Sequence, residues 1–280
     1  MNEQLAALRP RMMSVAYRML GSVVDAEDAV QDAFLRLHAT DDVTSPEGFL
    51  ITATTRRCID QLRVRSRTKY VGPWVPEPVE THDDASDSSL GESLTQAFLL
   101  LLERLTPDER AAFLLRTVFD YEYVEIGAIV DKSEASVRQL VSRARRRLGL
   151  AERRFRIDAA QADAMAERFT AACRAGDIAA IESLLTADAE LLSDGGGKVV
   201  AARVAIRGPE RIAKFLAGVF RKNRHFEVRP TVVNCRPGLE MFDVGKLVQV
   251  VSLDIDEQVR GIYVTRNPDK LARWSIAAVN

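Results

Sequence analysis

Two arginine-rich segments are the parts of this sequence best suited to binding chemistry. Residues 56–69 hold six basic side chains and one acidic one, and residues 138–156 hold eight and one. Residues 80–92, between them, hold five acidic side chains and no lysine or arginine, while the whole chain carries a formal charge of only -1. Either basic segment alone is consistent with a solvated helix face. Two of them, separated by an acidic segment, favour two contacts with one polyanion, and nucleic acid is the obvious candidate.

The second basic segment falls in a helix-turn-helix pattern. Helices are predicted at Glu122–Val130 and Glu134–Leu148, with a tight turn between them and Ser133 as the cap of the second. Apolar residues at helical spacing should hold the second helix on the domain, namely Val137, Leu140, Val141, Ala144 and Leu148. The outward face then consists of Glu134, Ala135, Arg138, Gln139, Ser142, Arg143 and Arg146. Arginine can bond guanine and glutamine can bond adenine in the major groove, but an ordinary basic helical hairpin fits the periodicity equally well.

The first basic segment ends a helix that is predicted to begin with Ser45 as cap and Pro46 in the first turn. Its arginines suit contacts with phosphates. Phe49 fits the core better than a base stack, and Cys58 fits a small buried residue. This helix therefore offers positioning on a nucleic acid more clearly than base reading.

The predicted helix from Val23 to Ala39 carries acidic side chains on one side, at Asp25, Asp28 and Asp32. Its apolar positions recur on another side, at Val23, Ala26, Val30, Ala33, Phe34 and Leu37. A negative face cannot contact DNA. It is either a solvated face or a docking surface for a basic protein partner, and metal binding is disfavoured because no histidine or loop geometry accompanies the carboxylates.

The elements that position these residues divide the chain into two kinds of structure. Helices are predicted at Leu5–Leu20, at Leu94–Leu105, and from the capping box of Thr106 and Glu109 to about Phe119. Residues 71–93 are rich in proline, serine and acidic residues and predict a solvated linker, in which Trp74 should dock on another part of the protein.

From about residue 158 the pattern becomes α+β. Helices are predicted at Gln161–Ala175, Asp177–Leu185 and Gly208–Phe220. Strands are predicted at Glu190–Ser193, Lys198–Ala205, Phe226–Asn234, Leu247–Asp254, Val259–Thr265 and Arg273–Val279. Breaks fall at Gly195–Gly197, Pro237-Gly238 and Asn267-Pro268.

Length and composition limit the classes of protein to which this chain can belong. A chain of 280 residues with 47% hydrophobic and 28% charged residues is typical of a globular protein of about two domains. No apolar run approaches the ~18 residues of a membrane span, and the first residues do not resemble a secretion signal. Cys58, Cys173 and Cys235, like the three histidines, are scattered, which predicts neither a disulfide framework nor a metal site. We therefore expect a cytoplasmic, reduced protein without metal.

Three motifs in residues 1–150 together resemble the RNA polymerase sigma factors of the extracytoplasmic-function (ECF) class. Asp25–Phe34 looks like the region 2 helix that binds core polymerase, and Thr55–Arg63 looks like the segment that melts and reads the -10 element. Tyr123–Gly127, followed by Ser136–Arg138 and Ser142–Arg145, is similar to region 4, which reads the -35 element. Arg56 departs from the asparagine that many members carry.

The C-terminal part narrows the group. Phe169–Asp177 followed by Asp194–Lys198 is similar to SnoaL-like domains of the cone-shaped NTF2 fold. Sigma factors with this extension share three short motifs, which stand here as Trp74–Pro78, Asp194–Lys198 and Asn267–Leu271, with Val75 where leucine is common. The expected fold is thus multidomain, with two all-α sigma domains and an α+β cone. Its expected parts are region 2 at 1–70, a linker at 71–93, region 4 at 94–152 and the SnoaL-like domain at 158–280.

The resemblance implies a role for each set of site residues. Core polymerase, through its beta and beta-prime subunits, would bind at Asp25, Asp28, Gln31, Asp32 and Leu35. The -10 element of promoter DNA would be contacted by Arg56, Arg57, Asp60, Arg63, Arg65 and Arg67. The -35 element would be contacted by Ser133, Glu134, Ser136, Arg138, Gln139, Ser142, Arg143 and Arg146. Regulation between the domains would use Trp74, Pro76, Glu77, Pro78, Asp194, Gly195, Gly196, Gly197, Lys198, Asn267, Pro268, Asp269, Lys270 and Leu271.

The SnoaL-like domain admits two interpretations. Related cones can be isomerases or cyclases, and Asp194 could serve as their base. Asp194 beside three glycines indicates a turn instead, so we expect no enzyme and no cofactor, and a domain that regulates the sigma regions in cis in place of a separate anti-sigma protein. A small apolar ligand in the cone could bias that control. The alternative function is a ligand-sensing DNA-binding regulator that acts without polymerase.

Overall fold

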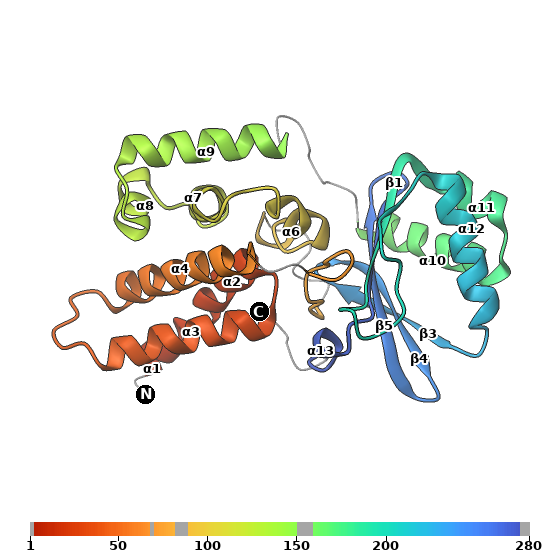
Figure 1. The fold of residues 1–280 in the computed structure, drawn as a ribbon, viewed down its shortest axis with the longest axis horizontal. Coiled ribbons are helices and arrows are strands. Elements are labelled where there is room, and N and C mark those ends of the chain that lie inside the picture. Colours follow the sequence, from red (N-terminus) through yellow and green to blue (C-terminus); the bar gives the residue numbers. More distant parts are fainter. Residues whose placement is uncertain (1–2, 68–69, 82–88, 150–158, 275–280) are drawn as a thin grey trace. The chain divides into compact units, whose positions relative to one another are not determined.

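The fold is known from a computed structural model, which describes residues 3–67, 70–81, 89–149 and 159–274. The chain divides into two compact units, coloured along the sequence in Figure 1. The helical unit consists of residues 1–69 and 98–153 together with 279–280, and the mixed unit consists of residues 70–97 and 154–278. Each unit is described by itself.

The first half of the helical unit contains α1 (Glu3–Ala6), α2 (Arg9–Leu20), α3 (Val23–His38) and α4 (Pro46–Arg65). The single helix predicted at Leu5–Leu20 is wrong, since a turn at residues 7–8 separates α1 from α2. Pro10 explains the break because it lies in the first turn of α2, where a missing N–H costs nothing. Ser22 caps α3 and Ser45 caps α4, and the apolar side predicted for α3 is buried.

The second half contains most of α6 (Gln96–Leu102), whose first two residues belong to the mixed unit, together with α7 (Pro107–Thr117), α8 (Tyr123–Val130) and α9 (Glu134–Leu148). The predicted capping box is present, with Thr106 and Glu109 each bonding the other's backbone N–H. The predicted helix Leu94–Leu105 is shorter than expected because turns flank α6. The two helices of the helix-turn-helix are confirmed, and Gly149 ends α9 in a left-handed conformation.

The mixed unit is an α+β domain. Its helices are α5 (Ser89–Glu92), α10 (Ala159–Ala175), α11 (Ile178–Ser183), α12 (Pro209–Lys222) and α13 (Pro268–Leu271). Its strands are β1 (Leu185–Asp194), β2 (Ile206–Arg207), β3 (Glu227–Val233), β4 (Arg236–Asp243), β5 (Lys246–Ile255) and β6 (Val259–Thr265). They form one sheet in the order β2-β1-β6-β5-β4-β3, in which β1 and β6 are parallel and the other pairs antiparallel.

The two faces of the sheet pack against different elements. α10, α11 and α12 lie along one face, and α13 contacts β5 on the other (Figure 1). Because side chains alternate along a strand, Ile262 and Val264 of β6 join the core under the helices, whereas Val250 of β5 packs with Trp274 on the opposite face. The unit thus has one large core and one small one.

Two predictions for this unit are wrong, and a third lies mostly outside the described residues. Lys198–Ala205 is not a strand but a loop before β2. Strand β4 was missed because Pro237-Gly238 indicated a break; in the fold, Gly238 lets β4 approach its neighbours, since a Cβ there would lie 2.5 Å from the Val251 carbonyl oxygen. Residues 273–274 are in a turn, and the rest of the predicted strand Arg273–Val279 lies outside the described residues.

The proline-rich segment is also unlike its prediction. Val75, Glu77 and Val79 are buried, and Glu80 forms an isolated β-bridge with Val233. Composition indicated a solvated linker because few of its residues could form a core of their own. They are instead buried against the C-terminal domain, which supplies the surface that the segment lacks.

Candidate functional sites

Helix α9 presents the polar face that its sequence predicts. Val137, Leu140 and Val141 are buried, whereas Arg138, Gln139 and Ser142 are exposed. The Ser133 hydroxyl accepts a hydrogen bond from the Ser136 N–H at 3.3 Å, which fixes the start of the helix. The first turns of α9 are thus free of core packing on the side that a major groove would receive.

Two predicted DNA-contacting residues of α9 already have local partners. Arg138 donates to the Glu134 carboxylate at 3.1 Å, and its guanidinium lies 4.3 Å from the centre of the Tyr123 ring. Glu109 of α7 is almost fully buried, and Arg147 and Arg143 approach its carboxylate at 2.6 and 3.6 Å. Glu109 therefore ties the second half of α9 to α7, while Gln139 and Ser142 remain exposed polar side chains nearer the start of the helix.

The basic end of α4 contacts the second half of the helical unit. Arg56 donates from Nε to the Ile129 carbonyl oxygen at 2.8 Å and from Nη2 to that of Ala128 at 3.0 Å, both in α8. Arg63 bonds the Asp108 carboxylate of α7 at 3.2 Å. Arg56, Arg63 and Arg65, three of the six predicted -10 residues, thus contact the second half of the unit; Arg65 is described next. Of the other three, Asp60 pairs with Arg63, Arg57 lies 3.9 Å from Asp32, and Arg67 is exposed.

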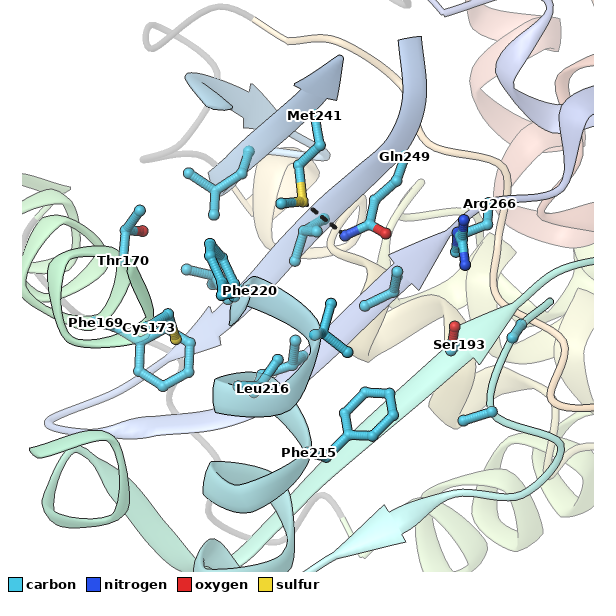
Figure 2. Close-up of a pocket in the computed structure, with 18 of the residues that line it drawn as sticks. Phe169, Thr170, Cys173, Ser193, Phe215, Leu216, Phe220, Met241, Gln249 and Arg266 are labelled. Carbon is cyan, nitrogen blue, oxygen red and sulfur yellow. Dashed lines mark hydrogen bonds between the residues drawn. The ribbon is translucent and has the colours of Figure 1, made fainter. Parts of the chain in front are cut away.

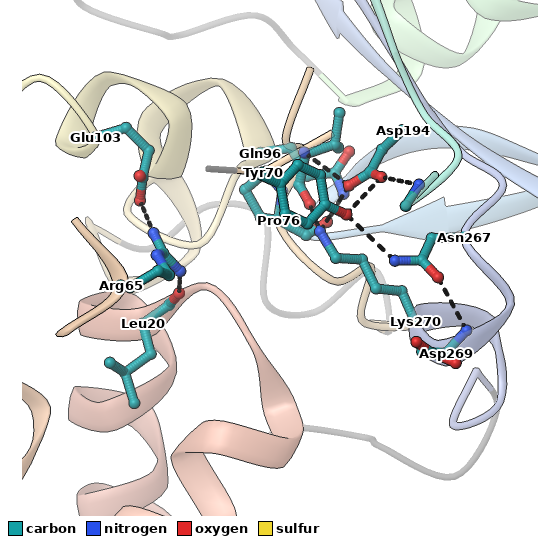
Figure 3. Close-up of polar contacts among 12 residues, drawn as sticks. Leu20, Arg65, Tyr70, Pro76, Gln96, Glu103, Asp194, Asn267, Asp269 and Lys270 are labelled. Atoms are coloured by element: carbon teal, nitrogen blue, oxygen red, sulfur yellow. Dashed lines mark hydrogen bonds and ion pairs between the residues drawn. The ribbon is translucent and has the colours of Figure 1, made fainter. Parts of the chain in front are cut away.

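A buried arginine, paired with a partly exposed glutamate, joins the two halves of the helical unit. Arg110, 3% exposed, donates to the carbonyl oxygens of Met19 at 2.8 Å and Leu102 at 2.7 Å and pairs with Glu103 at 2.9 Å. Arg65 reaches the same carboxylate at 2.6 Å while donating to the Leu20 carbonyl oxygen, as Figure 3 shows. Burial alone would raise the pKa of Glu103, but Arg110 and Arg65 outweigh it and lower that pKa.

This ion pair predicts acid sensitivity of the helical unit. A carboxyl group whose pKa is lowered in the folded state stabilises the fold above its unfolded pKa, near 4.5, and the effect disappears as pH falls through the lowered value. Glu103→Gln should remove this pH dependence and cost about 1–2 kcal/mol at pH 7, because the Arg110 charge stays buried while solvent screens the partly exposed Glu103 carboxylate. Urea unfolding followed by circular dichroism between pH 3 and 7 measures both. Equal pH dependence in the two proteins would contradict the role of Glu103.

The polar side of α3 is accessible as expected. Asp28 and Gln31 are exposed, Asp25 and Asp32 are half-buried, and Asp32 pairs with Arg36 at 2.9 Å. Leu35 is 61% exposed among these polar groups. An exposed apolar side chain on a helix that also presents Asp28 and Asp32 is suited to a protein partner with an apolar pocket and basic side chains beside it.

The mixed unit contains a buried polar site that holds residues 70–79, which we call the linker site: Tyr70, Val75, Asp194, Asn267 and Lys270. The Asp194 side chain is completely buried, and each of its oxygens accepts two hydrogen bonds (Figure 3). Oδ1 accepts from the Tyr70 hydroxyl at 2.7 Å and the Gly196 N–H at 2.9 Å. Oδ2 accepts from the Val75 N–H at 3.1 Å and from Lys270 Nζ at 2.7 Å.

Lys270 completes the site from the other side. Its Nζ also donates to the Val75 carbonyl oxygen, so both polar atoms of the Val75 backbone are bound by the Asp194–Lys270 pair. The same ammonium group lies 4.6 Å from the centre of the Trp74 ring and 5.4 Å from that of Tyr70. Burial and the Asp194 carboxylate raise the pKa of Tyr70, which keeps its hydroxyl protonated as a donor.

The other predicted regulatory residues lie around this site. A side chain at Gly196 would overlap the Asn267 amide, and one at Gly197 would lie 3.2 Å from Val71, so the glycines allow close approach. Lys198 pairs with Asp269 at the surface. Glu77 is buried, and so are Pro76 and Pro78. Pro268 begins α13, and Leu271 packs near Trp274.

Four residues of this arrangement were not predicted. Besides Tyr70, Gln96 donates to the Pro76 carbonyl oxygen at 2.9 Å. Asn234 accepts from the Val79 N–H and donates to the Leu94 carbonyl oxygen, and the Thr81 hydroxyl accepts from the Cys235 N–H. Only Asn234 carried a local signal, because asparagine is among the residue types that adopt positive φ, as it does in the β3–β4 hairpin.

The placement of Asp194 bears on the catalytic interpretation. The apolar cavity of this unit is lined by Ser193, whereas the neighbouring Asp194 carboxylate is bound within the linker site. Among the described residues there is no cluster of His, Cys, Asp and Glu suited to a metal ion, and no described helix is long and apolar enough to cross a membrane. The three cysteines are buried, and none of them forms a disulfide.

Comparison with known proteins defines the class of each part. Residues 5–68 match the family model of sigma-70 region 2, residues 95–148 that of sigma-70 region 4, and residues 166–240 that of the SnoaL-like domain. All three matches occur in the order that the motifs predict. A helical pair of sigma regions followed by a SnoaL-like domain is therefore the architecture of this chain.

Similar whole proteins identify the family. The chain is 38% identical over 227 residues to the ECF RNA polymerase sigma factor SigJ of Mycobacterium tuberculosis, covering 78% of this chain and 73% of that protein. It is 30% identical over 241 residues to the probable ECF sigma factor SigI of the same species, covering 82% and 79%. The crystal structure of M. tuberculosis SigJ matches with a TM-score of 0.79 at 32% identity, over 99% of this chain and 100% of that one. This chain belongs to the ECF RNA polymerase sigma factors, which direct transcription initiation at promoters.

Proposed function

We propose that this sigma factor is restrained in cis by its C-terminal unit, which holds the linker between regions 2 and 4. The supporting observation is that two hydrogen bonds hold the Val75 backbone: its N–H donates to Asp194, and its carbonyl oxygen accepts from Lys270. Because the Asp194 and Lys270 side chains are buried, solvent does not weaken these bonds as it would weaken a surface pair. The linker then has a bound state and a released state.

Promoter geometry favours release of the linker. The -10 and -35 elements are about 25 base pairs apart, which is about 85 Å along DNA at ~3.4 Å per base pair. Residues 70–97, fully extended, reach roughly 90 Å at ~3.3 Å per residue. The Gln96–Pro76 hydrogen bond closes most of this segment into a loop, so the bound linker has only a fraction of that reach.

The contacts within the helical unit support the same proposal. We propose that Arg56 and Arg63 contact DNA at the -10 element. In this structure they instead donate hydrogen bonds to α8 and α7, respectively. Regions 2 and 4 must therefore part before these guanidinium groups can bind phosphates and before the two regions can lie a promoter spacing apart. The bound linker opposes that separation.

We propose that α3 docks on the beta and beta-prime subunits of core polymerase through its acidic face and Leu35. Leu35→Ala should weaken core binding about tenfold or more, because an exposed apolar anchor loses its contact area. The affinity of purified core polymerase for the labelled full-length chain measures this. Val124→Ala, which removes an equally exposed side chain from α8, serves as the control. Equal core affinity of the Leu35→Ala protein and the wild type would contradict this docking surface.

The remaining assignments stay predictions. They are the -10 and -35 contacts, the lack of enzymatic activity, and control without a separate anti-sigma protein. We also propose that this sigma factor acts in the cytoplasm, because RNA polymerase works there.

A further inference from the structure

The concave face of the mixed unit's sheet encloses an apolar cavity of about 260 Å³. Alternate residues of three strands form one wall, and α10 and α12 form the other (Figure 2). Phe169, Phe215 and Phe220 supply most of the aromatic surface. Cys173 also lines it, and burial raises the pKa of that thiol to about 12, so it stays uncharged.

Polar groups gather at one end of this cavity. Every second residue at the end of β6 lines the cavity, namely Ile262 and Val264. Arg266, just after the strand, continues this row and so also lines the cavity wall. Gln249 and Ser193 lie at the same end, and Phe169 and Cys173 lie at the other (Figure 2). A ligand here would have an apolar body and one polar end.

Arg266 lacks a carboxylate partner among the described residues. Its Nη1 donates to the Val200 carbonyl oxygen, and its buried Nε has no hydrogen-bond partner there. Burial lowers the pKa of Arg266, and no acidic side chain offsets this effect. The Gln249 amide donates to the Met241 sulfur at 2.8 Å, which is a weak acceptor. Both donors would gain from an anionic acceptor.

We infer that this cavity binds a small monocarboxylic acid, with its carboxylate on Arg266 and Gln249 and its hydrocarbon body among the phenylalanines. An apolar cavity of about 150 Å³ accepts benzene, which sets a scale of about 25 Å³ per carbon. The cavity thus accommodates about ten non-hydrogen atoms, the size of octanoate. Arginine favours such an acid because its planar donors match a carboxylate.

The carboxylate end of the cavity adjoins the linker site. Ser193 and Arg266 line the cavity, and their chain neighbours Asp194 and Asn267 belong to the linker site. The N–H groups of Arg266 and Asn267 both donate to the Asp194 carbonyl oxygen, at 2.8 and 2.9 Å. A carboxylate that draws Arg266 away from Val200 loosens the 195–200 loop, in which Gly197 lies so near Val71 that a Cβ there would be 3.2 Å from the valine side chain. Binding therefore favours release of the linker, and this step rests on the proposed function.

Calorimetry of octanoate with the full-length chain tests the binding site. We expect saturable 1:1 binding, at least tenfold weaker for the isosteric neutral octanamide. Arg266→Gln should weaken octanoate binding at least tenfold, whereas Arg203→Gln, an exposed arginine in the same loop, should not. Val219→Phe, which fills the cavity from α12, should weaken both ligands. Absence of saturable binding, equal affinity for octanoate and octanamide, or full octanoate affinity in Val219→Phe would overturn the site.

Transcription in the presence of octanoate tests the coupling. Octanoate should raise run-off transcription with core polymerase for the wild type and leave Arg266→Gln unchanged. Stoichiometric binding with unchanged transcription would overturn the coupling if Asp194→Asn still raises transcription. If Asp194→Asn also has no effect, the failure lies in the proposed restraint by the linker rather than in the binding site.

Discussion

Replacing Asp194 with asparagine is expected to lower the free energy of unfolding of the mixed unit by about 3–5 kcal/mol. The change leaves Lys270 buried without its carboxylate and places an amide against the Val75 N–H. Both tryptophans, Trp74 and Trp274, belong to this unit, so their fluorescence during urea unfolding follows it selectively. Chymotrypsin should also cleave after Tyr70 and Trp74 faster than in the wild type.

A matched carboxylate provides the control for this prediction. Asp269→Asn removes a negative charge whose partner, Lys198, is exposed, and should cost less than about 1 kcal/mol. Combining Asp194→Asn with Lys270→Met removes both charges and should cost less than the sum of the single changes. A loss below 1 kcal/mol for Asp194→Asn alone would show that the pair does not hold the linker.

Replacing Gln139 with alanine is expected to weaken promoter binding by about 1–3 kcal/mol, or roughly 5- to 150-fold, at one position of the -35 element. Gln139 is exposed near the start of α9, where a side-chain amide can pair with a base edge. Binding of the holoenzyme to promoters substituted at each -35 position measures the loss. The effect should vanish when that base pair is changed.

An arginine outside α9 distinguishes base reading from general charge. Arg104→Ala, at an exposed position after α6, should leave the preference among -35 sequences unchanged. Uniform weakening by Gln139→Ala across all sequences, with no preferred position, would contradict base reading by this side chain.

Local signals predicted much of the helical unit. Caps at Ser22, Ser45, Thr106 and Ser133 are side chains that bond backbone N–H groups a few residues away, so the sequence carries them directly. The same holds for the buried stripe of α9. The break before α2 shows how one proline in a first turn can interrupt an apparently continuous stripe.

The linker site could be predicted only in part, because its contacts are distant in sequence. The motif resemblance indicated that Trp74, Asp194 and Lys270 belong to a regulatory site. Tyr70 and Gln96 join that site through hydrogen bonds that no local sequence pattern predicts. Strand β4 was hidden for a related reason. Its Pro237-Gly238 pair is typical of a break between strands. Only the neighbouring strands, which approach Gly238 too closely for a Cβ, show why glycine fits inside this strand.

Run-off transcription with purified core polymerase on a library of promoter fragments tests the central claim most directly. The full-length chain would be compared with Asp194→Asn and with the milder Trp74→Ala, which removes the ring beside Lys270 and keeps the ion pair. We expect the same promoters to be used by all three proteins, with severalfold more transcript from both variants. Transcript levels that do not rise in either variant would contradict restraint by the linker, and the absence of promoter-specific transcript from all three would contradict the sigma function itself.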